Sequence, residues 1–267
     1  MAAPVFAVGD VHGHRDVVVG LLRDAGLLDE REGWAGADAT LWLMGDLFDR
    51  GPDGIAALEL VRRLERESGG SVRCLLGNHE ALILAARRFG AEDTSFPGQT
   101  FHDVWKQNGG VDADLAALTD EQADWLTRLP PVARDGDWLL VHADTDAYLD
   151  LGASLAAVTA TTGSVLRTGD ANQVDELLGI LSDRQRLDDQ RSVDALLGAY
   201  GGGRIVHGHT PIASVIGAEP RDVTAPLVYG SGRVTNIDHC LFAGGPGFVV
   251  RLDEEQDGSG PETRPTC

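Results

Sequence analysis

The sequence has few cysteines, few basic residues and no long apolar run. Its three cysteines, Cys74, Cys240 and Cys267, are odd in number and far apart in 267 residues, which argues against a disulfide framework or a zinc knuckle. Lysine and arginine number 22 against 42 aspartates and glutamates, a formal net charge of −20. Such a charge argues against binding to nucleic acid, whose phosphates need a positive surface, and against an anionic membrane.

The chain also lacks a segment that we would expect to cross a membrane. The longest apolar stretch free of charge, Leu151–Leu166, is rich in threonine and serine and is shorter than the ~20 residues of a spanning helix. The first ten residues have neither the basic start nor the apolar core of a signal peptide. We therefore expect a cytoplasmic protein that binds neither nucleic acid nor membrane, and the sequence leaves its oligomeric state open.

What the sequence does contain is an alternation of short apolar runs and helical patterns. Buried strands are predicted at residues 4–8, 40–44, 72–76, 138–141 and 204–206. Helices are predicted after Arg15, after Pro52, over Thr119–Leu129, and over Val174–Leu181 and Val193–Tyr200, the last two capped by Asn172 and Ser192. Three more short strands, at 227–230, 234–237 and 248–252, indicate an antiparallel hairpin or meander. The pattern predicts one α/β domain over residues 1–252 and a polar, disordered tail over 253–267.

Polar clusters follow five of the predicted strands. In an α/β sheet the carboxyl ends of the strands meet at one crevice where ligands bind, and glycine lets the backbone approach such a ligand. A single Gly-Asp or Asn-His pair often marks a simple turn, but five clusters in order after apolar runs indicate a shared site. The clusters are Gly9-Asp10-Val11-His12-Gly13, Gly45-Asp46-Leu47-Phe48-Asp49-Arg50-Gly51, Gly77-Asn78-His79-Glu80, His142-Ala143, and His207-Gly208-His209-Thr210.

The residue types in these clusters favour one kind of chemistry. Carboxylate, imidazole and amide ligands without thiolate suit manganese, iron or zinc. Two such ions ~3.5–4 Å apart can share a carboxylate, activate a bridging water and clamp an in-line displacement at phosphorus. A histidine nearby can protonate the leaving oxygen, and an arginine can hold the phosphate oxygens in a bidentate fork. The clusters therefore predict a phosphoester hydrolase with two metal ions.

The ordered set GDVHG, GDLFDRG, GNHE, a strand-end histidine and a Gly-His resembles the phosphoprotein phosphatase branch of the calcineurin-like metallophosphoesterases, in its bacterial, serine/threonine phosphatase-like form. The resemblance covers most of Val5–Thr210. It implies a sandwich of two mixed β-sheets packed face to face with α-helices outside. It also implies two divalent ions, manganese in the first place, with iron or zinc as alternatives.

The resemblance also assigns roles to individual residues. It implies that His79 is the general acid, that Asp49 orients it, and that Arg50 binds phosphate. The family's second phosphate-binding arginine should precede the last cluster, where Arg184 is our choice and Arg186 the alternative. The implied metal ligands are Asp10 and His12 for the first ion, Asp46 as the bridge, and Asn78, His142 and His209 for the second.

Two departures from the family pattern leave questions open. His207 lies two residues before His209, on the same side of an extended strand, and is an alternative ligand. The fourth cluster reads His142-Ala143-Asp144 instead of the family's His-Ala-Gly, and we expect Asp144 and Asp146 to be solvated loop residues.

The resemblance implies hydrolysis of phosphate monoesters, with phosphoserine and phosphothreonine on proteins as the expected substrates. The alternative is a dinucleoside-tetraphosphate hydrolase or another small-molecule phosphoesterase that uses the same site. A scaffold that binds phosphoproteins without turnover would be expected to lack His79 or Asp49, and both are present.

Overall fold

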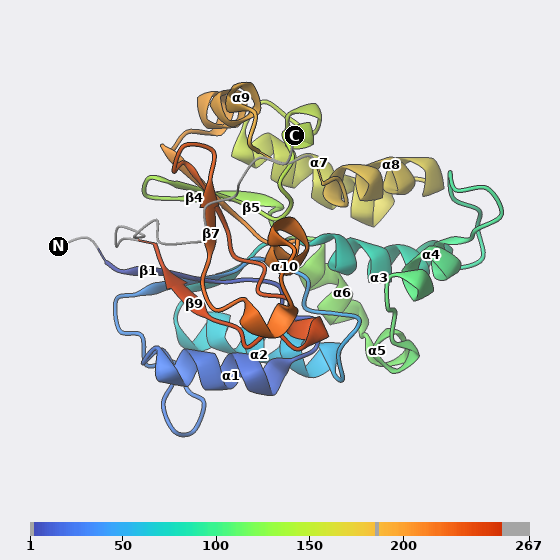
Figure 1. Ribbon diagram of the computed structural model, residues 1–267. Helices are drawn as coiled ribbons and strands as arrows, with labels where there is room; N and C mark the ends of the chain where they lie inside the picture. Colours follow the sequence, from blue (N-terminus) through green and yellow to red (C-terminus); the bar gives the residue numbers. More distant parts are fainter. Residues whose placement is uncertain (1–2, 185–186, 253–267) are drawn as a thin grey trace.

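Two β-sheets form the centre of the computed structural model, which describes residues 3–184 and 187–252 (Figure 1). The first sheet has the strand order β3-β2-β1-β9, in which β1, β2 and β3 are parallel and β9 is antiparallel to β1. Its strands are β1 (Val5–Val8), β2 (Thr40–Leu43), β3 (Val72–Cys74) and β9 (Val249–Arg251). The predicted tail, 253–267, lies outside the described residues.

The second sheet has the order β4-β5-β6-β8-β7, with parallel central strands and an antiparallel strand at each edge. Its strands are β4 (Val132–Asp135), β5 (Trp138–Val141), β6 (Arg204–His207), β7 (Leu227–Tyr229) and β8 (Val234–Asn236). The predicted hairpin exists between β7 and β8, but a three-stranded meander is wrong. β9 instead crosses to the first sheet and pairs with β1. The alternation of apolar residues predicts a strand but does not determine which sheet edge that strand joins.

The two sheets pack face to face through alternate side chains of their strands. In β5, Trp138 and Leu140 belong to the apolar cluster between the sheets, whereas Leu139 and Val141 belong to the cluster shared with the helices. Burial of both faces explains why these strands are nearly continuous apolar runs in the sequence. The predicted α/β sandwich of two mixed sheets flanked by helices is confirmed.

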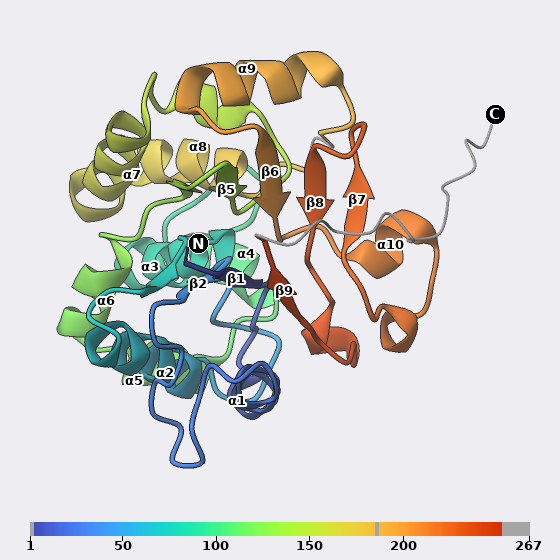
Figure 2. The same cartoon turned by 90° about the vertical axis from the view of Figure 1, so that its left-hand side faces the viewer.

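Helices lie on the outer faces of the sheets (Figures 1 and 2). Helices α1 and α2 lie beside the first sheet, α7 and α9 pack on the second, and α8 packs on α3 and α7. The α-helices are α1 (Arg15–Asp24), α2 (Gly54–Glu67), α3 (Asn78–Phe89), α4 (Phe101–Gln107), α5 (Asp112–Ala117), α6 (Asp120–Leu126), α7 (Leu155–Thr168), α8 (Ala171–Leu181), α9 (Gln190–Tyr200) and α10 (Ile212–Ile216). Short 3₁₀ turns are η1 (Ala147–Asp150), η2 (Pro220–Asp222) and η3 (Leu241–Ala243). Within 3–184 and 187–252, no helix has the length and apolar character needed to span a membrane.

Helix starts agree only in part with the sequence predictions. The capping box that begins α6 at Thr119 is present, with Gln122 returning the hydrogen bond. Helix α8 is capped by Asp170 and α9 by Asp189, so the predicted caps Asn172 and Ser192 are wrong. At the start of α8, Asp170 accepts from the Gln173 N–H, and the Asp170 N–H donates to Gln173 Oε1. These two reciprocal bonds make Asp170 the cap instead of Asn172.

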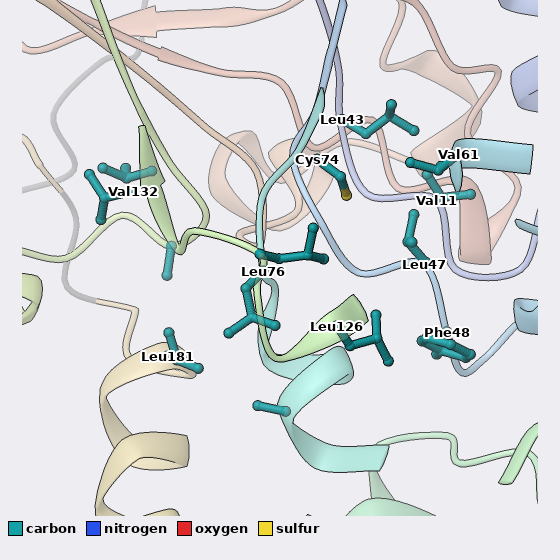
Figure 3. Packing of buried hydrophobic residues seen from close by; sticks show 14 of the residues in the cluster. Val11, Leu43, Leu47, Phe48, Val61, Cys74, Leu76, Leu126, Val132 and Leu181 are labelled. Atoms are coloured by element: carbon teal, nitrogen blue, oxygen red, sulfur yellow. The ribbon is translucent and has the colours of Figure 1, made fainter. Parts of the chain in front are cut away.

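Buried apolar side chains support the loops at the strand ends. Figure 3 shows Leu43 and Cys74 of the first sheet, Leu76 beyond β3, and Leu126 of α6 in one packed cluster. Phe48, in the loop after β2, belongs to the same cluster and is fully buried. The polar segments after the strands are therefore held by a rigid base.

Candidate metal centre

The five polar clusters meet in one buried site at the carboxyl ends of β1, β2, β3, β5 and β6. Contacts join loops that are far apart in the sequence: the backbone N–H of His79 donates to Asp46 Oδ1 at 3.0 Å, and that of His209 donates to Asp10 at 3.0 Å. The predicted metal-ligating and catalytic side chains are each at most 3% exposed: Asp10, His12, Asp46, Asn78, His142, His209, Asp49 and His79. The structure thus brings the predicted set together.

Asp46 lies at the centre of this set. Its Oδ2 is 3.7 Å from His12 Nε2 and 3.9 Å from His79 Nε2, and its Oδ1 is 3.3 Å from His142 Nε2. Two groups of possible metal ligands share it, one with His12 and His79 and the other with His142 and His209, each within 4.8 Å. A carboxylate common to two groups fits the bridging position that the sequence predicts.

The hydrogen bonds of His142 show why a cation fits here. Its Nδ1–H donates to the Met44 carbonyl at 2.7 Å, so in the neutral ring Nε2 carries a lone pair. Burial lowers the pKa of His142, which disfavours a second ring proton. The lone pair faces Asp46 Oδ1 at 3.3 Å and Asn78 Oδ1 at 3.1 Å. His142 Nε2, Asp46 Oδ1 and Asn78 Oδ1 therefore lie close together with no hydrogen between them, and their lone pairs repel one another. A divalent cation bound among the three atoms would remove this repulsion.

The other imidazoles are oriented in the same way. His12 donates from Nδ1 to the Phe48 carbonyl at 2.9 Å, and His209 donates from Nε2 to the Ser182 carbonyl at 3.2 Å. Burial lowers the pKa of both rings well below the ordinary value. Each ring thus keeps a lone pair on its second nitrogen, and outer hydrogen bonds of this kind typically fix the tautomer of metal-binding histidines.

Three buried carboxylates, those of Asp10, Asp46 and Asp238, lie close enough together to affect one another's pKa. Burial, together with Asp238 and Asp46, raises the pKa of Asp10 well above its usual range. Burial also raises the pKa of Asp238 to about 6. Divalent cations would compensate such a cluster of carboxylates.

The backbone at the site is shaped by glycine and by left-handed residues. A Cβ at Gly77 would lie 2.1 Å from Asp46 Oδ1, and one at Gly208 would lie 2.2 Å from Asp10 Oδ1, so only glycine fits beside these carboxylates. His12, Asp46 and His209 have φ values of 44°, 51° and 64°. Non-glycine residues with positive φ are uncommon and store strain that tends to concentrate at functional sites.

His79 forms a buried pair with Asp49 beside this cluster. Its Nδ1 lies 2.7 Å from Asp49 Oδ2, and because an ionised carboxylate only accepts, Nδ1 donates. The Nε2 atom is buried, has no hydrogen-bond partner among the residues that the structure describes, and faces the Asp46 carboxylate. The second Asp49 oxygen accepts from the indole N–H of Trp105 at 2.9 Å, a contact that the sequence analysis missed because Trp105 lies 56 residues away in an unmarked segment.

Replacing Trp105 with phenylalanine is expected to lower kcat by roughly 10-fold while leaving bound metal unchanged. The indole N–H is lost, so Asp49 and in turn His79 are held less firmly, and losses of 10–100-fold are usual for outer partners of an active group. Kinetics and metal analysis measure both quantities, with Trp34→Phe, in the loop before β2, as the matched control. A Trp105→Phe enzyme with wild-type kcat would contradict this positioning role.

The two predicted phosphate-binding arginines border the site. Arg50 Nη1 lies 3.3 Å from His12 Nε2, and its guanidinium stacks 4.4 Å from the centre of the Phe242 ring. Arg184 donates from Nη1 to the His209 carbonyl at 2.8 Å. Its alternative, Arg186, lies outside the described residues. Phe242 was not expected from the sequence, since nothing local marks a 3₁₀ turn as part of the site.

His207 lies apart from the two ligand groups. Strand β6 ends at His207, and the chain then turns, so the assumption of an extended strand through His209 does not hold. The His207 ring lies 2.8 Å from the Tyr229 hydroxyl and 2.9 Å from the Gly208 carbonyl, in the second sheet. This geometry favours His209 as the ligand.

Two further acids tie the loops together. Asp144 is buried and accepts from the Thr210 hydroxyl at 2.7 Å, so the expectation of a solvated loop residue is wrong for it. Glu80 accepts from the backbone N–H groups of Asp46, Leu47 and Gly77, each at 2.7–2.8 Å. Through these three bonds Glu80 joins the loop after β2 to the loop after β3.

Comparison with known proteins gives the following relatives. A family model described as calcineurin-like phosphoesterase matches residues 3–243. The chain is 34% identical over 152 residues to a symmetrical bis(5'-nucleosyl)-tetraphosphatase from Pectobacterium atrosepticum. That alignment covers 56% of this chain and 46% of the relative, so the chain spans about half the length of the curated relatives it matches.

Solved structures with the same fold include phosphatases of two specificities. A cold-active protein-tyrosine phosphatase of a psychrophilic Shewanella species matches with a TM-score of 0.68 and 20% identity, covering 96% of this chain and 76% of that one. A protein serine/threonine phosphatase from Saccharomyces cerevisiae matches with a TM-score of 0.58 and 16% identity, covering 88% of this chain and 67% of that one. At these identities the likeness is one of fold.

Proposed function

This chain belongs to the calcineurin-like phosphoesterase family. We propose that it hydrolyses dinucleoside tetraphosphates symmetrically, at a site for two divalent metal ions. The main support for a site with two metal ions is the position of the Asp46 carboxylate, which belongs to both groups of buried possible ligands. The substrate class is supported by the similarity to the symmetrical tetraphosphatase from Pectobacterium atrosepticum, although the chain covers only 46% of that protein.

The proposed metal ligands are the six residues that the resemblance implies; His12, Asp46, His142 and His209 belong to the two groups of possible ligands, and Asp10 lies beside them as the acceptor of the His209 N–H. Asp10 and His12 would hold one ion, Asp46 would bridge, and the second would be held by Asn78, His142 and His209. The bound ions would supply positive charge to the phosphate and lower the pKa of a water molecule. Manganese stays the predicted metal, with iron or zinc as alternatives, since histidine, carboxylate and amide ligands suit all three.

The remaining residues would bind the substrate and move a proton. Arg50 and Arg184 lie on two sides of the ligand groups and would hold non-bridging phosphate oxygens. In symmetrical hydrolysis, water adds to one of the two central phosphorus atoms and the bond from that atom to the central bridging oxygen breaks. His79 Nε2, held by Asp49 through Nδ1, would give its proton to that oxygen, which leaves on a nucleoside diphosphate.

Hydrolysis of phosphoserine or phosphothreonine, the substrates first expected from the sequence, would use the same residues. The nucleotide substrate has the better support because the curated relatives act on bis(5'-nucleosyl) tetraphosphates. The serine/threonine phosphatase neighbour is similar in fold alone.

A substrate comparison tests the proposed function. The manganese-loaded enzyme is expected to hydrolyse diadenosine tetraphosphate with a kcat/KM at least ~100-fold above that for phosphoserine and phosphothreonine peptides, because two nucleosides add binding energy that a peptide does not supply. Chromatography of the products should show ADP alone. A higher kcat/KM for phosphopeptides, or ATP with AMP as products, would contradict symmetrical tetraphosphate hydrolysis.

A further inference from the structure

A cavity of about 460 Å³ lies between the loop that joins α3 to α4 and helix α8. Its walls include Phe96 of the loop, Gln107 of α4, Asn108, and Leu178, Gly179 and Ser182 at the end of α8. The volume falls within the ~300–1,000 Å³ of typical small-molecule sites. None of the proposed metal ligands lines it, so it is a separate hollow beside the metal centre.

Two residues connect this cavity to the candidate metal centre. The Asn108 carbonyl accepts from Arg50 Nε at 3.3 Å, and the Ser182 carbonyl accepts from His209 Nε2 at 3.2 Å. Both residues also line the cavity. The cavity is therefore a neighbour of the metal centre, separated from it by the arginine and the histidine that these two carbonyls contact.

The residues that line the cavity suit a flat, uncharged group that can form hydrogen bonds at its edges. Phe96 is 58% exposed, an unusual state for a phenylalanine ring, and its loop is fixed to α8 by a hydrogen bond from the Ser95 N–H to Asp175 Oδ2 at 2.8 Å. Apolar walls come from Val104 and Leu178, and side-chain amides come from Gln99 and Gln107. Asn108 also lines the cavity and donates from Nδ2 to the Val104 carbonyl at 2.8 Å. Aromatic stacking together with amide hydrogen bonds is how proteins bind unpaired bases.

The charges at the cavity argue against a phosphate group as its occupant. Among residues 3–184 and 187–252, no lysine, arginine or histidine lines it, and its one acid, Asp175, is directed at the Ser95 N–H. A phosphate would face a carboxylate there without a cation. A base and its ribose carry no charge and meet no such penalty.

We propose that this cavity binds one nucleoside of a nucleotide substrate, with its base against Phe96. The inference rests on the proposed function for its substrate class, and it names the part of the chain that recognises the nucleoside. The cavity would then decide between nucleotides and simple phosphoesters, while the metal centre acts on the phosphates common to both.

The test compares ADP with inorganic pyrophosphate as inhibitors of 4-nitrophenyl phosphate hydrolysis by the metal-loaded enzyme. Both bring a diphosphate to the metal centre, so the ratio of their inhibition constants isolates the nucleoside. We expect the wild type to favour ADP and Phe96→Ala to reduce that preference roughly 5- to 100-fold, the range for loss of one base stack. Hydrolysis of 4-nitrophenyl phosphate itself should not change. Val17→Ala, at an exposed apolar residue of α1, is the matched control.

The outcomes separate this inference from the proposed function. An unchanged preference in Phe96→Ala would overturn the inference even if diadenosine tetraphosphate is hydrolysed normally. A wild type that does not hydrolyse that substrate, yet prefers ADP through Phe96, would overturn the proposed function and support the nucleoside site. If Phe96→Ala instead lowers kcat/KM for phosphopeptides and leaves ADP unaffected, the cavity takes an apolar peptide side chain and the inference is wrong.

Discussion

Replacing Asp46 with asparagine is expected to remove bound metal and phosphoesterase activity together. Its carboxylate is the one member common to both ligand groups, with His12 Nε2 at 3.7 Å and His142 Nε2 at 3.3 Å. Asparagine keeps the shape but loses the charge that would hold two cations at once. Activity should fall by roughly 10³-fold or more, since a metal ion contributes several kcal/mol to the transition state and about 1.4 kcal/mol is tenfold.

The fold of the Asp46→Asn protein should survive. Asparagine Oδ1 can still accept the His79 N–H, and removal of one charge relieves the repulsion that raises the pKa of Asp10. The metal-free variant should therefore still unfold in one cooperative thermal transition, as the metal-free wild type does. Metal analysis, kinetics and thermal unfolding measured on the same sample check all three expectations.

Asp53→Asn is the matched control for this substitution. Asp53 follows the same loop and caps α2 by accepting the Ala56 N–H at 2.8 Å, a role in which asparagine serves equally well. Its metal content and kcat should equal those of the wild type. If Asp46→Asn retained both ions and its turnover, the bridging position of Asp46 would be wrong.

The strand ends explain why so much of the site could be predicted from sequence. Asp10, Asp46 and His142 each follow an apolar run within a few residues, and the carboxyl ends of parallel strands necessarily meet. The position of a polar residue directly after an apolar strand therefore indicates that it lies near the other strand-end residues in the fold. The ring tautomers could not be predicted, because the carbonyls that fix them, such as that of Met44, are placed only by the fold.

Residues that act on the site across the fold left no local signal. Trp105 reaches Asp49 from α4, and Phe242 stacks on Arg50 from a 3₁₀ turn near the end of the described chain. Asp238 follows β8, a strand that the sequence predicts only as part of a hairpin, so its polar end carries no sign of the shared site. The parallel pairing of β6 with β8, which only the fold shows, brings Asp238 to the site.

Replacing His79 with asparagine is expected to slow turnover by roughly 10²–10⁴-fold with both metal ions retained, the usual loss for a general acid. His79 commits Nδ1 to Asp49 at 2.7 Å, which leaves Nε2 to give a proton to the leaving oxygen. The loss should be large for phenyl phosphate and small for 2,4-dinitrophenyl phosphate, whose leaving group needs no proton. Asp49→Asn should show the same dependence on leaving group, because it acts through the same imidazole.

The His79→Asn variant also tests whether His79 is a metal ligand, because His79 belongs to one of the two groups of possible metal ligands. Its Nε2 is 3.9 Å from Asp46 Oδ2, close to the 3.7 Å at which His12 lies from the same atom. If His79 binds metal instead of donating a proton, His79→Asn should lose about one ion per chain and slow all leaving groups equally. Asp49→Asn would then change turnover much less than His79→Asn, because Asp49 does not belong to either group. Metal content and leaving-group dependence, measured together, therefore decide whether this imidazole is an acid or a ligand.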